Sequence, residues 1–256
     1  MKNSIKKVIQ SVVLVLALTS CEKESASDSD EVILIQASGN ISDKVEQFRN
    51  MLGQLNSEPG ATSGRREINW DGVPDSLEGK ALPDDLFNPV GSGATVSMQR
   101  GLTYDPNGGT FMVSSNNFSD INNDASSNFS AFSGNKTFSN VGAAKWPVSF
   151  QKAGTDASAS VQGFGAVFSD VDEGNTTSLE LFNGTKSIGK FFVPAHDNTS
   201  SFSFLGVYFK NSEHITKVLV THDGFLAEGT KDVSDGGTRD LIVLDDFIYS
   251  EPLEEK

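Results

Sequence analysis

The chain has 256 residues, of which 34 are acidic and 20 basic, so its formal net charge is -14 at pH 7. So acidic a surface repels phosphate backbones, which excludes nucleic acid as an expected partner. A chain of this length can build one large hydrophobic core, whereas its single cysteine cannot form a disulfide within the chain. The core must therefore supply the stability of the fold.

The first twenty residues have the layout of a secretory signal. Three lysines precede an apolar run over residues 8–18, which is too short for a membrane-spanning helix of about 20 residues. The residues "LTS" before Cys21 resemble the lipobox of bacterial lipoproteins. The resemblance implies that residues 1–20 are removed, which moves the charge to -17, and that Cys21 is lipidated. The alternative is an ordinary cleaved signal that leaves a free thiol.

Lipidation predicts where the protein resides. Each buried CH₂ of an acyl chain contributes about 0.8 kcal/mol, so several chains on Cys21 hold a protein stably on a membrane. The expected location is the bacterial outer membrane, on its periplasmic or cell-surface face. Residues 22–31, "EKESASDSDE", are too polar to offset their ordering entropy. We expect residues 21–39 to be a flexible acidic tether, either a plain spacer or, by resemblance to some Gram-negative lipoproteins, a signal for surface export.

A helix is predicted at about residues 42–52. The apolar side chains there recur with helical spacing, at Ile41, Val45, Phe48, Leu52 and Leu55. Ser42 or Asn40 can cap its start, and Gly53 interrupts the periodicity near its end.

Downstream, short runs rich in Val, Phe, Ile and Thr alternate with Gly, Asn, Asp and Ser clusters, which indicates an antiparallel β-sandwich or barrel. The predicted strands cover residues 94–99, 110–114, 128–132, 160–168, 178–182, 187–193, 202–209, 215–222 and 241–249. Asn183-Gly184 predicts a tight hairpin turn. The 18 phenylalanines are expected to fill the core between two sheets, and residues 116–140 to form either a meander of short strands or a long surface loop. The prediction is thus one jelly-roll-like β-sandwich domain over residues 40–256 with a short N-terminal helix.

Two segments carry a family resemblance: "GRREINWDGVPD" at residues 64–75 and "DLIVLDDFIYSEP" at residues 240–252. They resemble a group of exported bacterial proteins of uncharacterised function that combine an R-E-I-N-W-D-G-V-P element with a jelly-roll-like half ending in D-D-F-x-Y-x-E-P. The C-terminal half is more distantly similar to galactose-binding-type β-sandwiches. That second resemblance implies carbohydrate binding and a structural calcium, as expectations from fold alone.

Clustered acids suggest a calcium site. Calcium takes six to eight oxygen ligands, which carboxylates and carbonyls supply. The candidates are Asp170, Asp172 and Glu173 after a predicted strand, and Asp245 and Asp246 within the last strand. Solvated turn carboxylates are the alternative for the first group. Adjacent strand residues point to opposite faces, so Asp245 or Asp246 needs an inward partner such as a backbone N–H, an Arg or a metal.

The motif at residues 64–75 allows two interpretations. It can be a glycan platform, in which a sugar lies on Trp70 while Asp71 accepts hydrogen bonds from its hydroxyls; Trp146 invites the same interpretation. It can instead be a structural clasp, in which Trp70 covers a sheet end, Asp71 and Gly72 turn the chain, and Arg66 pairs with an inward acid such as Asp245.

Catalytic signatures are weak, and we predict no catalytic residue. The sequence has no Gly-x-Ser-x-Gly elbow, His-Glu-x-x-His motif or phosphate-binding loop. The leading hypothesis is a non-catalytic, lipid-anchored envelope protein that binds carbohydrate. The alternatives are a structural or adhesive envelope component with protein partners and, third, a glycan-active hydrolase or lyase that uses paired carboxylates.

Overall fold

The computed structural model describes residues 32–196, 201–210 and 214–254. The predicted signal, Cys21 and residues 22–31 of the predicted tether lie outside these ranges. The tether prediction is wrong in its last part, because Val32–Gly39 form strand β1, paired along its length with another strand. The sequence "VILIQASG" places Ile33, Ile35 and Ala37 on one face, where they join a hydrophobic cluster.

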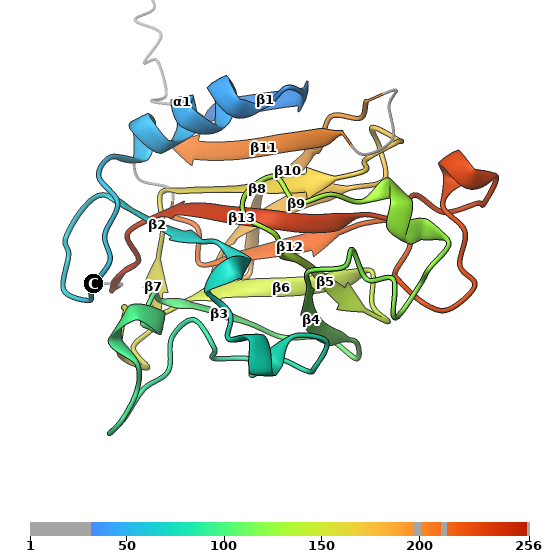
Figure 1. Cartoon of the computed structure of the whole chain (residues 1–256). Helices are drawn as coiled ribbons and strands as arrows, with labels where there is room; N and C mark the ends of the chain where they lie inside the picture. Colours follow the sequence, from blue (N-terminus) through green and yellow to red (C-terminus); the bar gives the residue numbers. More distant parts are fainter. Residues whose placement is uncertain (1–31, 197–200, 211–213, 255–256) are drawn as a thin grey trace, which may run out of the picture.

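Two antiparallel sheets contain most of the described strands and confirm a mainly β fold (Figure 1). The larger sheet has the order β1, β11 (Phe202–Phe209), β8 (Gly163–Ser169), β13 (Val243–Ser250), β5 (Thr137–Val141) and β4 (Thr110–Ser114), with β2 (Arg65–Ile68) paired to β13. The smaller sheet has the order β10 (Lys186–Phe192), β9 (Ser178–Asn183), β12 (Lys217–Thr221), β6 (Lys145–Phe150) and β3 (Leu102–Tyr104). A short ribbon pairs β14 (Leu253–Glu254) with β7 (Ala159–Ser160).

The helical elements are short. Helix α1 spans Ser42–Leu52, where the apolar spacing places a helix, but it follows β1 and is therefore the second element of the described chain. The remaining helices are single 3₁₀ turns: η1 (Trp70–Gly72), η2 (Asp75–Leu77), η3 (Val96–Met98), η4 (Ala125–Asn128) and η5 (Val233–Asp235).

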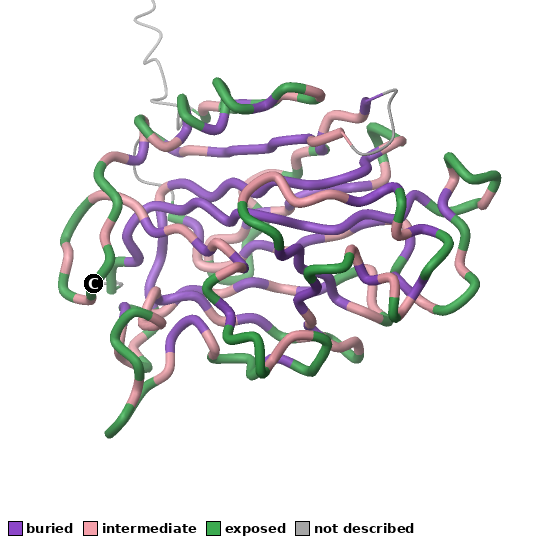
Figure 2. Tube along the Cα trace, in the orientation of Figure 1, coloured by how far each residue is buried: buried purple, intermediate pink, exposed green. Residues whose placement is uncertain are grey.

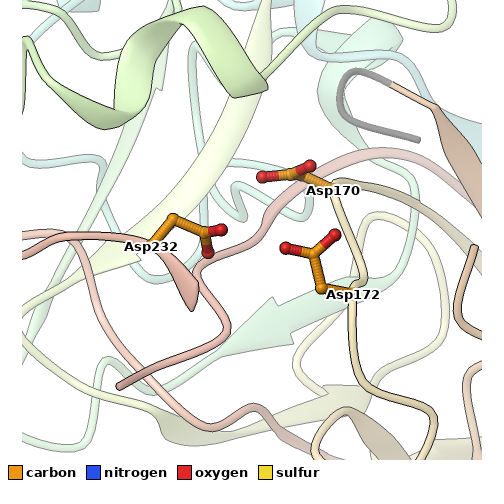
Figure 3. A group of neighbouring side chains, drawn as sticks. All are labelled: Asp170, Asp172 and Asp232. Atoms are coloured by element: carbon orange, nitrogen blue, oxygen red, sulfur yellow. The ribbon is translucent and has the colours of Figure 1, made fainter. Parts of the chain in front are cut away.

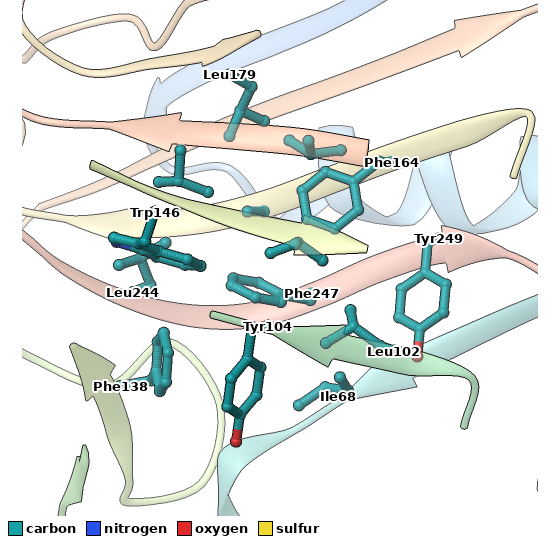
Figure 4. Packing of buried hydrophobic residues seen from close by; sticks show 14 of the residues in the cluster. Ile68, Leu102, Tyr104, Phe138, Trp146, Phe164, Leu179, Leu244, Phe247 and Tyr249 are labelled. Atoms are coloured by element: carbon teal, nitrogen blue, oxygen red, sulfur yellow. The ribbon is translucent and has the colours of Figure 1, made fainter. Parts of the chain in front are cut away.

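Aromatic side chains fill the space between the sheets (Figure 4). Trp70 stacks on Phe138 of β5 with 3.9 Å between ring centroids, and Phe138 meets Trp146 of β6 edge-on at 5.6 Å. These contacts join the two sheets, because β5 and β6 belong to different ones. Figure 2 shows that β8 and β13 are buried along their whole length. The prediction that phenylalanine fills the core is thereby confirmed.

Helix α1 covers the outer face of the larger sheet, where glycines make room for it. A Cβ at Gly165 would lie 2.9 Å from Phe48 Cε1, and one at Gly206 would lie 2.8 Å from Phe48 Cδ2. Only glycine lets the Phe48 ring approach the sheet so closely, and Phe48 is fully buried there. The apolar face of α1 and these two glycines therefore form a second hydrophobic cluster.

Most predicted strands occur within a few residues of their expected positions, but two do not. Residues 94–99 contain η3, and residues 128–132 comprise the last residue of η4 and the loop that follows it. Both segments have the residue composition of a strand, but no described strand pairs with them. The hairpin turn also lies one residue later than predicted, at Gly184 and Thr185, and of the two only Gly184 has a positive φ, 59°. The Asn-rich residues 116–136 form turns around η4, and β5 begins at Thr137.

A buried ion pair joins β2 to the end of β13. Arg66 is fully buried and donates to both carboxylate oxygens of Glu251, at 2.6 and 2.8 Å. Asn56 also donates to Glu251, at 2.8 Å. Burial of two charges costs several kcal/mol, which this bidentate geometry offsets, so removal of one partner leaves an uncompensated charge.

We therefore expect Glu251→Ala to lower the free energy of unfolding by about 3 to 5 kcal/mol. The control is Glu254→Ala, because Glu254 pairs with Lys152 at 3.2 Å with both side chains more than half exposed. Loss of that pair should cost less than about 1 kcal/mol. Urea unfolding measures both, and equal losses would contradict a structural role of the buried pair.

Candidate functional site

The two tryptophans considered as glycan platforms lie in the core. Trp70 and Trp146 are both fully buried, so neither ring offers a face to a sugar. Trp70 donates through Nε1 to the backbone oxygen of Asp245 at 2.8 Å. The platform interpretation is wrong for these rings, because their stacking partners already cover them.

Asp71 is also engaged by the protein. Its Oδ1 accepts a hydrogen bond from the backbone N–H of Asn135 at 2.8 Å. Gly134 packs against the same carboxylate so closely that a Cβ there would overlap it, and Gly134 has a φ of 61°. Asp71 therefore organises the turn before β5, and the 3₁₀ turn η1 at Asp71 and Gly72 turns the chain as the clasp interpretation requires. The clasp differs from the prediction in two ways: Trp70 lies in the core between the sheets and not over a sheet end, and Arg66 pairs with Glu251 and not with Asp245.

Asp245 and Asp246 sit in an irregular part of β13. The register with β8 shifts between Leu244 and Phe247, so the strand bulges at the two acids. Asp245 accepts from the backbone N–H groups of Phe132 and Ser133, at 2.6 and 3.0 Å. A bulge interrupts the alternation of side chains, which is why the expectation of opposite faces is wrong: both carboxyls accept from Ser133, Asp245 from its backbone N–H at 3.0 Å and Asp246 from its hydroxyl at 2.7 Å.

Asp246 points toward α1. It accepts from the Ser133 hydroxyl at 2.7 Å and pairs with Arg49 of α1 at 3.1 Å, and Arg49 also pairs with Glu67. Hydrogen-bond donors of the protein thus occupy the carboxyls of Asp245 and Asp246. These contacts argue against the prediction that the two acids are metal ligands. The two acids are adjacent and at most 1% exposed, so they also do not face each other across a cleft as glycosidase carboxylates do.

Three other carboxylates converge at one end of the sandwich (Figure 3). Asp170 follows the last residue of β8, Asp172 comes two residues later, and Asp232 precedes η5 on a facing loop. One oxygen of each lies within 4.8 Å of the others. Asp170 has a φ of 67°, a conformation that Asp tolerates better than most residues. The sequence pattern singled out Asp170 and Asp172 as candidate ligands but did not assign Asp232 to the site.

Hydrogen bonds hold this three-carboxylate site in place. Asp232 accepts from the backbone N–H of Leu241 at 2.7 Å through Oδ1 and from that of Ser234 at 2.7 Å through Oδ2. A fourth acid, Asp240, fixes the facing segment by accepting from the backbone N–H groups of Asp172 and Glu173, at 3.2 and 3.1 Å. Glu173 itself is exposed and is not one of the three, so the structure does not place it at the site.

The site concentrates negative charge. Desolvation, the hydrogen bond to Asp232 and the charges of Asp232 and Asp240 raise the pKa of Asp172 to about 7. Burial also raises the pKa of Asp240. The pKa of a carboxylate rises when its charge lacks compensation, so a proton or a cation would stabilise this arrangement. The three acids supply hard oxygen ligands, and the Ser234 hydroxyl, which donates to Asp232, is a further oxygen nearby.

The chain shows significant similarity to no protein-family model, curated protein or solved structure. Among residues 32–254, apart from the two undescribed gaps, no helix has the length and apolar character needed to cross a membrane.

The buried acid pair in β13 predicts how stability depends on pH. Burial and the neighbouring Asp246 charge raise the pKa of Asp245 to about 8. Between pH 4 and 8 the folded state therefore holds a proton that the unfolded state releases. The free energy of unfolding should fall as the pH rises through this range, by about 1.4 kcal/mol per unit where one proton separates the states.

Asp245→Asn keeps the acceptor for Phe132 and Ser133 but cannot ionise, so we expect a flatter profile in urea unfolding at pH 5, 6.5 and 8. Asp172→Asn serves as a second variant, because Asp172 titrates in the same direction near pH 7. An unchanged slope in Asp245→Asn would show that Asp245 does not carry the effect.

Proposed function

We propose that this protein is a lipid-anchored, non-catalytic binding protein of the bacterial cell envelope, with a structural calcium ion at Asp170, Asp172 and Asp232. The observation that carries the proposal is the convergence of these three carboxylates, two of them fully buried. Calcium would neutralise their charge and tie the segment after β8 to the loop that contains η5. The residues fit the ion because all three offer hard oxygen ligands.

Carbohydrate is the ligand class that we propose. Nucleic acids and other polyanions are disfavoured by the charge of -14. The two-sheet architecture supports carbohydrate binding only by analogy of fold. We propose further that the two sheets form a jelly-roll, since the chain crosses repeatedly from one sheet to the other.

A structural or adhesive role is the second candidate, favoured by one observation. Strand β1 pairs with β11 along one edge, and within the described residues no strand pairs with its other edge. Val32 and Leu34 on this strand are 38% and 43% exposed. An open edge strand with apolar side chains can accept a strand from another protein.

Calcium should raise the thermal midpoint of the protein, and chelator should lower it. A ligand at 100 times its Kd stabilises the native state by about 2.7 kcal/mol, which corresponds to roughly 5 to 10 °C for a domain of this size. Asp172→Asn should abolish the calcium shift and raise the midpoint in chelator, because it relieves repulsion. Asp156→Asn, in an exposed turn, should respond like the wild type. The same midpoint in calcium and chelator would contradict the metal site.

Lipidation is tested on the full chain expressed in a Gram-negative host with an alkyne-labelled fatty acid. We expect the wild type to carry the label and to partition into detergent, and Cys21→Ser to lose both properties. Label on the Cys21→Ser variant would contradict the anchor.

A further inference from the structure

A pocket of about 730 Å³ lies at the other end of the larger sheet from the three-carboxylate site. Met51 and Leu52, the last residues of α1, form one wall, and β7 and β14 form another. Strand β8 separates the two features, because it begins beside this pocket at Gly163 and ends just before Asp170. Seven strand residues span about 20 Å. We call this feature the α1-end pocket; its volume is in the range of small-molecule sites.

The lining of the α1-end pocket combines apolar side chains (Met51, Leu52 and Leu253) with polar ones and carries little net charge. Hydroxyl or amide groups come from Thr62, Ser63, Ser160, Gln162, Asn183 and Ser250. Of its two carboxylates, Glu251 is neutralised by Arg66 and Glu254 pairs with Lys152. None of the lining residues is Lys or Arg, and His214 is the one lining side chain that can gain a positive charge by protonation, so the pocket offers an anionic ligand no permanent cation.

One aromatic ring stands beside these polar groups. Tyr208 of β11 is partly exposed and lines the pocket. A Cβ at Gly163 would lie 2.9 Å from Tyr208 Cδ2 and 2.8 Å from Leu52 Cδ2. Because Gly163 has no Cβ, the Tyr208 ring and Leu52 can pack directly against the sheet, and this packing fixes the position of the ring. An aromatic ring with a polar edge, surrounded by hydroxyl and amide groups, suits a ligand that has both C–H faces and hydroxyls.

We propose that the α1-end pocket binds a short neutral saccharide, with the ring of Tyr208 under one sugar and Gln162 among its hydrogen-bonding partners. The proposal rests on the proposed carbohydrate-binding function and gives it a site. Neutral sugars match the lining because they need donors and acceptors but no counter-charge. Calcium has only a structural role in this arrangement, because the carboxylates lie beyond the opposite end of β8.

The test is isothermal titration of the folded protein, in calcium, with maltotriose, cellotriose, mannotriose and chitotriose as neutral probes and trigalacturonate as the anionic probe. For the neutral probe that binds, Tyr208→Ala should weaken affinity at least about tenfold, as loss of a central aromatic contact does. Tyr208→Phe, which keeps the ring, should stay within about threefold, and Gln162→Ala should also weaken binding. Phe192→Ala removes an exposed ring on β10, 41% exposed, and should have no effect.

Thermal unfolding of each variant shows whether it is folded, so lost binding with an unchanged midpoint supports the pocket. Binding that survives both Tyr208→Ala and Gln162→Ala would overturn the pocket while leaving a carbohydrate-binding function elsewhere on the protein. Stronger binding of trigalacturonate than of the neutral probes would overturn the neutral ligand class. No binding of any neutral probe at millimolar concentration would overturn the inference, whereas the calcium shift decides the structural metal separately.

Discussion

Strand β13 places two acids, Asp245 and Asp246, in the centre of a hydrophobic sheet, and the surrounding structure supplies hydrogen-bond donors to both. A buried carboxyl needs hydrogen-bond donors or a proton, since its desolvation otherwise costs several kcal/mol. Asp245 takes two backbone N–H groups from residues 132–133, and Asp246 takes the guanidinium of Arg49. The position of α1 and the path of the loop before β5 are therefore linked to the bulge in β13. Trp70 joins the same centre through the backbone oxygen of Asp245.

The two segments that carry the family resemblance form one structural unit. Strand β2 from the first pairs antiparallel with β13 from the second, in the register Ile68 to Phe247 and Arg65 to Ser250. The Arg66–Glu251 ion pair and the Trp70 hydrogen bond close this unit at its two ends. These residues thus have structural reasons for their chemistry, and none of Arg66, Trp70 or Glu251 is free to act on a ligand through its charged or aromatic group.

The two candidate functional features occupy opposite ends of β8 and differ in character. The three-carboxylate site is compact and negative, which suits a cation that joins two loops. The α1-end pocket carries little net charge, which suits a neutral ligand. The proposed metal site and the proposed ligand site are thereby separated by the length of a strand, so a substitution can address one without the other.

Local patterns in the sequence determined the mainly β class, helix α1, the phenylalanine core and the acids after β8, because hydrophobic periodicity and turn chemistry act over a few residues. Only the tertiary structure decided what depends on distant partners. Asp232 lies beside Asp170 although more than sixty residues of chain separate them. Arg66 forms its ion pair with Glu251 and not with Asp245. Tyr208 packs beside the end of α1 at Gly163. The bulge at Asp245 and Asp246 likewise follows from pairing with β8, and strand composition at residues 94–99 failed because a strand forms only beside a neighbour.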